Sequence, residues 1–115
     1  MAIVHTAMFS FKPLVPPEEI EGMGRRLLEL KDKCVHPRDN KPYIKSAMGG
    51  TDTSSEQLQD GITHVFMCEF ENAEDREYYL HEDPTYADFC KRFEGIIEKK
   101  QVVDFVPGQF TTCAR

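Results

Sequence analysis

The sequence predicts an α+β fold of the ferredoxin-like kind, a β-α-β-β-α-β chain with a four-stranded antiparallel sheet and its helices on one face. Three observations support this prediction. Residues 2–11 and 62–70 alternate with the period of a strand, residues 20–34 carry apolar side chains with the period of a helix, and two helical segments precede a last strand at 102–106. Because nothing in the 115 residues resembles a linker, we expect a single domain over residues 1–115.

The elements of the first third have clear signals. One face of the first strand consists of Ile3, His5, Ala7, Phe9 and Phe11. Pro16 and Pro17 end this strand and open the first helix, because proline is tolerated in a helix's first turn. The apolar stripe of the helix consists of Ile20, Met23, Leu27, Leu30 and Cys34. These two sets of side chains are predicted to face each other.

The remaining elements are predicted from turn-forming and helix-capping residues. We expect a turn-rich connection at 35–42, a short strand at 43–47 and a polar loop at 49–61. Asn72 is a candidate N-cap for a helix over 73–80, and Asp83-Pro84 begins a second helix. The strand at 62–70 is expected to place His64, Phe66, Cys68 and Phe70 on the helix-covered face. The second helix is expected to carry Tyr86, Phe89, Phe93, Ile96 and Ile97 on one side.

Helices on one face leave the other face of the sheet open. The predicted open face includes Val4, Met8, Val65, Met67, Val103 and Phe105. Burying apolar surface stabilises a contact by about 25 cal/mol per Å2. We therefore expect a homodimer in which two sheets pack through their open faces, as in a dimeric α+β barrel.

The composition argues against several classes of function. A net charge of −6 with scattered Lys and Arg is unlike a nucleic-acid binder. No apolar run reaches the ~18 residues of a membrane span, so no membrane partner is expected. Four cysteines without a C-x-x-C pair indicate reduced thiols and a cytoplasmic protein. Without zinc-like spacings or a phosphate loop, we expect no metal and no cofactor.

Several segments spread over the chain resemble one known family. They are Ile3-Val4-His5, Phe9-Ser10-Phe11-Lys12, Leu30-Lys31-Asp32-Lys33-Cys34, Lys41-Pro42-Tyr43-Ile44-Lys45-Ser46, Leu58-Gln59-Asp60-Gly61-Ile62-Thr63-His64, Glu69-Phe70-Glu71-Asn72-Ala73-Glu74-Asp75-Arg76, Tyr78-Tyr79-Leu80, Asp83-Pro84 and Val102-Val103-Asp104-Phe105. Together they resemble the stress-responsive A/B barrel (Dabb) proteins, of the kind common in fungi. The resemblance implies the fold and the dimer, whereas an activity must be argued from a site.

Some members of this family, such as polyketide cyclases of the olivetolic-acid type and certain hydroxynitrile lyases, are cofactor-free acid/base catalysts. Their pocket lies between the sheet and the helices. By that resemblance, His5 and His64 match pocket histidines. Tyr86 stands where the cyclases place a catalytic histidine, and Leu27 stands where they place a pocket tyrosine. The one nearby histidine, His81, lies on the other side of Asp83-Pro84 from that position.

The residues themselves suggest roles, each with an alternative. An imidazole such as His5 suits proton transfer at neutral pH, and pairing of the first and last strands would set Asp104 opposite it. The alternative is a buried pair that only ties two strands together. His64, expected at about 13 Å from His5 at ~3.3 Å per residue, is either the far end of the pocket or a satisfied core histidine. His81 is either a base or an exposed helix-end residue.

Two functions therefore remain open. The first is an enzyme, a cyclase, isomerase or lyase acting on a small apolar carbonyl or polyketide-like ligand. In it the catalytic residues would be His5, His81 and Tyr79, and the substrate would contact His64, Tyr86, Leu27, Phe66 and Asp104. The second is a non-catalytic stress-response or ligand-binding dimer whose histidines are structural.

Overall fold

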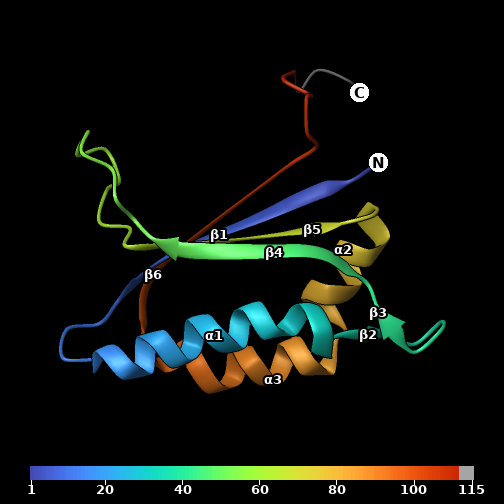
Figure 1. Ribbon diagram of the computed structural model, residues 1–115, viewed down its shortest axis with the longest axis horizontal. Helices are drawn as coiled ribbons and strands as arrows, with labels where there is room; N and C mark the ends of the chain where they lie inside the picture. Colours follow the sequence, from blue (N-terminus) through green and yellow to red (C-terminus); the bar gives the residue numbers. More distant parts are fainter. Residues whose placement is uncertain (112–115) are drawn as a thin grey trace.

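A four-stranded antiparallel sheet with helices on one side makes up the protein, whose computed structural model describes residues 1–111. The elements are β1 (Ile3–Phe11), α1 (Pro17–Lys33), β2 (Val35–His36), β3 (Lys41–Pro42), β4 (Ile44–Thr51), β5 (His64–Phe70), α2 (Ala73–His81), α3 (Pro84–Phe93), the 3-10 helix η1 (Glu94–Ile96) and β6 (Ile97–Phe105). The strand order is β4-β5-β1-β6, and α1 and α3 run beneath the sheet (Figure 1). The ferredoxin-like prediction is confirmed. Residues 112–115, with Cys113, lie outside the described part.

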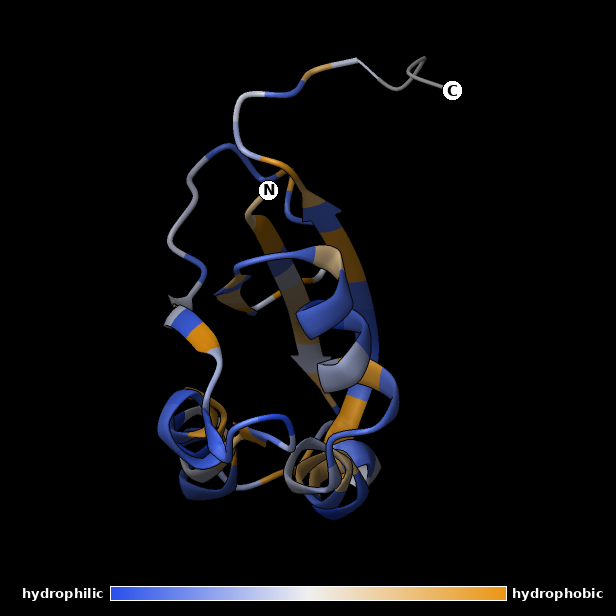
Figure 2. Ribbon diagram, turned by 90° about the vertical axis from the view of Figure 1, so that its right-hand side faces the viewer, coloured by the Kyte–Doolittle hydropathy of each residue, from blue (hydrophilic) through white to orange (hydrophobic). Residues whose placement is uncertain are grey.

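The central strand β1 shows the predicted alternation. Its residues at odd positions from Ile3 to Phe9 are buried on the helix side, and those between them are half-buried. On one side β1 pairs with β5, and on the other it pairs with β6. The first and last strands are therefore neighbours, which brings residues from the two ends of the chain together. Figure 2 shows α1 and α3 end-on as a layer against one face of the strands.

The middle of the chain corrects two predictions. β4 extends to Thr51 and includes Gly49 and Gly50, which the sequence had suggested for a loop. These glycines pair with Phe66 and Val65 of β5, so cross-strand pairing overrides the local turn signal. The connection at 35–42 contains the small β2–β3 hairpin, and β5 begins at His64 rather than at residue 62.

The end of the second long helix also differs from its prediction. The sequence extended the apolar stripe of this helix through Ile96 and Ile97, but α3 ends at Phe93. Ile96 belongs to η1, and Ile97 opens β6, five positions before the predicted strand. The cause is long-range pairing: Ile97 lies opposite Phe11, and the backbone N–H of Lys12 donates to the carbonyl of Ile96 at 3.0 Å.

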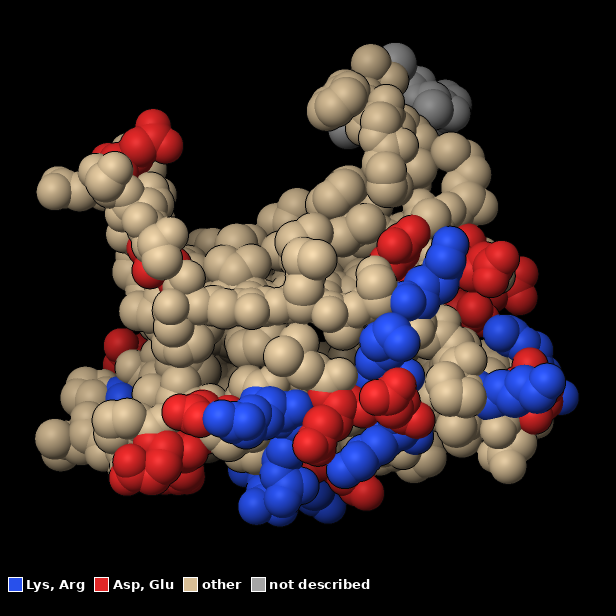
Figure 3. Space-filling view, in the orientation of Figure 1, with Lys and Arg blue, Asp and Glu red and all other residues tan. Residues whose placement is uncertain are grey.

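The face of the sheet opposite the helices is open. Its large apolar side chains include Met48, Val103 and Phe105, which are 63%, 56% and 44% exposed. The loop between β4 and β5 and the segment after β6 project on either side of this face (Figure 1). Figure 3 shows the same profile as a hollow between two projections, with few charged side chains along its floor.

Candidate functional site

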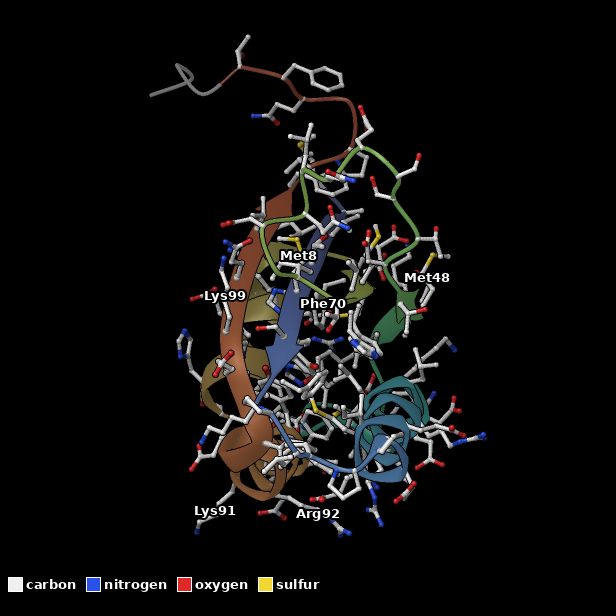
Figure 4. The ribbon with its side chains drawn as sticks, turned by 90° about the vertical axis from the view of Figure 1, so that its left-hand side faces the viewer. Met8, Met48, Phe70, Lys91, Arg92 and Lys99 are labelled. Atoms are coloured by element: carbon white, nitrogen blue, oxygen red, sulfur yellow. The ribbon has the colours of Figure 1, made fainter. Side chains whose placement is uncertain are left out.

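A cavity of about 220 Å3 lies between the sheet and the helices. Its walls are mainly apolar and come from β1, α1, β4, β5, α2, α3 and β6. Of the residues that the sequence suggested, the lining includes His5, Leu27, Phe66, Tyr79 and Tyr86. Phe70 of β5 is fully buried near this cavity, and Figure 4 shows Lys91 and Arg92 of α3 pointing away from the sheet. Most of the predicted site residues are therefore brought together around one cavity.

His5 is a buried imidazole in the wall of this cavity, at 4% exposure. Its Nδ1 lies 2.8 Å from Oδ1 of Asp104, as expected from the pairing of β1 with β6. A carboxylate only accepts hydrogen bonds, so Nδ1 carries the proton and donates it. Burial lowers the pKa of His5 and outweighs the opposing attraction of Asp104. At neutral pH the ring is therefore uncharged, and Nε2 is its free basic nitrogen.

Asp104 has a second partner that the sequence analysis missed. Nη1 of Arg76 donates to Oδ2 of Asp104 at 3.1 Å, and the Arg76 side chain is 23% exposed. Arg76 precedes Tyr79 by three positions on α2, so the two side chains share one face of that helix. This spacing was the signal available in the sequence. The guanidinium holds the carboxylate in the position from which it accepts the hydrogen bond of His5.

Two stacked tyrosines form the wall near His5. The rings of Tyr79 and Tyr86 are 4.0 Å apart between centroids, and the rings of Tyr79 and His5 form a T-shaped pair with centroids 6.1 Å apart. Burial raises the pKa of both phenols well above the ordinary value. Both hydroxyls therefore stay protonated and can donate hydrogen bonds to an oxygen atom of a ligand.

The position of Tyr86 is set by a buried cap. Asp83 begins α3 by accepting hydrogen bonds from the backbone N–H groups of Thr85 and Tyr86. Its other carboxylate oxygen accepts from the hydroxyl of Tyr43 at 2.6 Å. The strand β4 begins directly after Tyr43, so this bond ties the edge of the sheet to the start of the helix that carries Tyr86.

His64 does not belong to this cavity. As expected from the register, it pairs with Phe9, but it lines a second hollow between α1 and the end of β4. Its ring meets Phe11 at 5.0 Å, and its Nδ1 lies 2.8 Å from the hydroxyl of Thr63. Phe66 and Leu28 line both hollows and stand between them. The expectation that the two histidines mark opposite ends of one pocket is therefore corrected.

Of the two alternatives for His81, the structure agrees with the exposed helix-end residue and not with a base in the cavity. His81 ends α2 with its side chain 67% exposed, and its Nε2 lies 3.5 Å from a carboxylate oxygen of Glu77, one turn earlier. Tyr79 is buried on the inner side of the same helix. Because His81 follows Tyr79 by only two positions, it must face outward.

Charged residues that no sequence pattern indicated lie at the rim of the cavity. Glu94 and Lys100 line the cavity near the start of β6, and Lys31 lines it from α1. The Cys68 thiol lines the wall as well, and burial raises its pKa to about 12, so it is no thiolate at neutral pH. Over residues 1–111, no cluster of three His, Cys, Asp or Glu side chains is arranged for a metal ion. None of the described helices has the length and apolar character to cross a membrane.

The fold and cavity define a ferredoxin-like α+β protein with a pocket between its two layers. A family model for the stress responsive A/B barrel domain matches residues 3–107, and the chain belongs to this family. The stress-response A/B barrel domain-containing protein HS1 of Arabidopsis thaliana is 33% identical over 106 residues, which cover 91% of this chain and 89% of that protein.

Solved structures give the same result for the fold. The ensemble-refined crystal structure of At3g17210 from A. thaliana is 32% identical, with a TM-score of 0.78 over 96% of this chain and 99% of that one. A hydroxynitrile lyase from Passiflora edulis is 21% identical, with a TM-score of 0.78 over 96% and 97% of the two chains. A ferredoxin-like protein of unknown function from Bacteroides fragilis, described as dimeric, is 18% identical, with a TM-score of 0.63 over 90% and 94%.

Proposed function

We propose that the cavity binds a small, largely apolar carbonyl compound and that His5 moves a proton of this ligand. The observation that carries the proposal is the uncharged imidazole of His5, oriented by Asp104 within an apolar cavity. Burying the imidazole of His5 in such a place is unfavourable unless its nitrogens are satisfied; Asp104 satisfies Nδ1, and Nε2 is left for a ligand. A base whose pKa lies at or below neutrality is suited to proton transfer at physiological pH.

In the proposed reaction, Nε2 of His5 accepts a proton from a carbon or oxygen atom next to the carbonyl group and later returns it. The hydroxyls of Tyr79 and Tyr86 donate hydrogen bonds to the carbonyl oxygen, where negative charge develops. Such a sequence of steps suits a lyase, an isomerase or a cyclase of the polyketide kind. The P. edulis neighbour is a lyase built on the same fold, so the fold accommodates this class of chemistry in another protein.

Exchange of α-protons tests this chemistry without knowledge of the natural substrate. Acetophenone and 2-octanone would be incubated with the protein in D2O, and deuterium incorporation would be followed by NMR. We expect exchange above the buffer rate, with a loss of about a hundredfold in His5→Gln. His81→Gln is the matched control and should exchange like the wild type, because His81 lies outside the cavity. Exchange that is equally fast in His5→Gln rejects the role of His5.

The second candidate is a binding dimer without turnover. It is favoured by one observation: the cavity contains a single histidine, because His64 and His81 lie elsewhere among the described residues. The hydroxyls of Tyr79 and Tyr86 are enough to bind and polarise a carbonyl group, whereas many proton transfers use two acid/base groups. Chemical-shift changes at His5 and Tyr79 on adding the ketones, without exchange, would identify this function.

We further propose that the protein is a cytoplasmic homodimer of the barrel kind, in which two copies pair through the open faces of their sheets. The exposed apolar side chains of this face, the free thiols of Cys34, Cys68 and Cys90 and the dimeric neighbours support this proposal. Val103 and Val102 provide a matched test, since they are similarly exposed but project to opposite faces of β6. Light scattering should give a dimer for the wild type and for Val102→Asp, and a monomer for Val103→Asp. A monomeric wild type would overturn the proposal.

A further inference from the structure

The rim of the cavity carries a lysine, Lys100, whose ammonium group lies near an aromatic ring. Lys100 lies on β6, opposite Phe9 of β1, and its ammonium group lies 5.9 Å from the centre of the Phe9 ring. Phe9 and His5 project to the same face of β1, so Lys100 stands over the same cavity as His5. Within residues 1–111, Lys100 forms no ion pair.

The neighbouring lysine shows what a structural role would look like. Lys99 projects to the opposite face of β6 and reaches the loop after β4, where its ammonium group binds both the side chain and the carbonyl of Asp60 at 2.8 Å. In Figure 4 Lys99 lies on the outer side of this edge strand. Lys99 therefore holds the loop after β4 in place, whereas the charge of Lys100 lies at the rim of a largely apolar cavity.

The other charged groups of the lining do not neutralise Lys100. Lys31 enters from α1 on the opposite side, and its ammonium group lies 3.9 Å from Asp32. Glu94 is the one carboxylate among the lining residues, and it is exposed at the end of α3. The positive charge of Lys100 also contributes to the lowered pKa of His5, so its field extends into the cavity. An anionic group of a ligand between Lys100 and His5 would be attracted by the positive charge of Lys100.

We propose that Lys100 selects ligands that carry one anionic oxygen group, such as a carboxylate, at the end of an apolar body. The carboxylate would lie at the rim beside Lys100, and the apolar body would extend over Phe9 toward His5 and Tyr79. This inference rests on the proposed function of the cavity and specifies its ligand as an apolar carboxylic acid. Lys100 is itself exposed at the rim, so water screens this contact as it does in other surface ion pairs.

Octanoate and 1-octanol test the selection, because they share a chain and differ in charge. Binding would be measured by NMR titration of the His5 and Tyr79 signals at pH 7.5. We expect the wild type to bind octanoate more tightly than 1-octanol, and Lys100→Met to lose about fivefold of the octanoate affinity while its octanol affinity changes by less than about twofold. Lys100→Arg should keep the preference. Lys99→Met is the matched control and should bind like the wild type.

The outcomes separate this inference from the function on which it rests. If both ligands shift the cavity signals with equal affinity in the wild type, the role of Lys100 is overturned and the apolar pocket stands. An equal loss in Lys100→Met and Lys99→Met also overturns it, because the effect would then follow the net charge. If neither ligand shifts the signals of His5 and Tyr79, both the ligand class and the proposed pocket are overturned.

Discussion

Nδ1 of His5 lies 2.8 Å from Oδ1 of Asp104, although 99 positions separate the two residues in the sequence. The pairing of β1 with β6 sets this contact, and Arg76 of α2 completes it from the second oxygen of the carboxylate. Three elements thus meet at one imidazole. The pKa of His5 therefore depends on residues from separate parts of the chain, and substituting each of them tests its contribution.

The first prediction concerns the charges around His5. Asp104 raises the pKa of His5, whereas Arg76 lowers it. We expect Asp104→Asn to lower the pKa of His5 further and Arg76→Gln to raise it. NMR titration of the imidazole 15N signals measures both changes. Shifts in the same direction for the two variants would contradict the charge arrangement described here.

The second prediction concerns stability at acidic pH. The pKa of His5 in the folded protein lies below its ordinary value of 6.5, so the unfolded chain binds this proton first as the pH falls. Stability from the neutral, buried ring is therefore complete above about pH 6.5 and declines as the pH falls below it. Urea unfolding at pH 7.5 and 5.5 should show a smaller loss of stability in His5→Gln than in the wild type. His64 has a pKa shifted in the same direction and remains in both proteins, so the difference between them isolates His5.

The third prediction concerns the buried bond between Tyr43 and Asp83. Tyr43→Phe removes a donor from a carboxylate that is 2% exposed, and we expect a loss of about 1–3 kcal/mol of unfolding free energy. Denaturant unfolding measures the loss. In a double-mutant cycle with Asp83→Asn, the two effects should be less than additive, because the same hydrogen bond is removed twice. Strict additivity would show that the two side chains do not interact.

The fourth prediction concerns the close approach of β4 to Phe66. A β-carbon on Gly49 would contact the Phe66 ring and lie 2.8 Å from the carbonyl oxygen of Val65. Gly49→Ala should therefore displace Phe66, which separates the two hollows, and destabilise the fold by about 1–3 kcal/mol. Gly50→Ala is the matched control, since a β-carbon there meets nothing within 4 Å. Equal melting temperatures for the two variants would contradict this account.

Much of this arrangement followed from local patterns in the sequence. The alternation around His5 and in 62–70 established the strand faces, and the stripe from Met23 to Leu30 established the buried side of α1. The N-cap Asn72 and the start of α3 at Asp83-Pro84 were also correctly predicted. These features are local, because a side chain's face depends on the period of its own element and a cap depends on the next three residues.

The tertiary structure decided the rest. Ile97 lies in β6 opposite Phe11 and not in the predicted helix, and Gly49 lies in β4 opposite Phe66 and not in a loop. Arg76 of α2 donates a hydrogen bond to Asp104 of β6. His64 is separated from the cavity because the Phe66 side chain lies between the two hollows, which is also a result of tertiary packing. By itself the sequence determined the fold class and the inward positions of His5 and Tyr79. Only packing decided which charges surround them, because partners from distant segments are selected by register and by the space that neighbouring side chains leave.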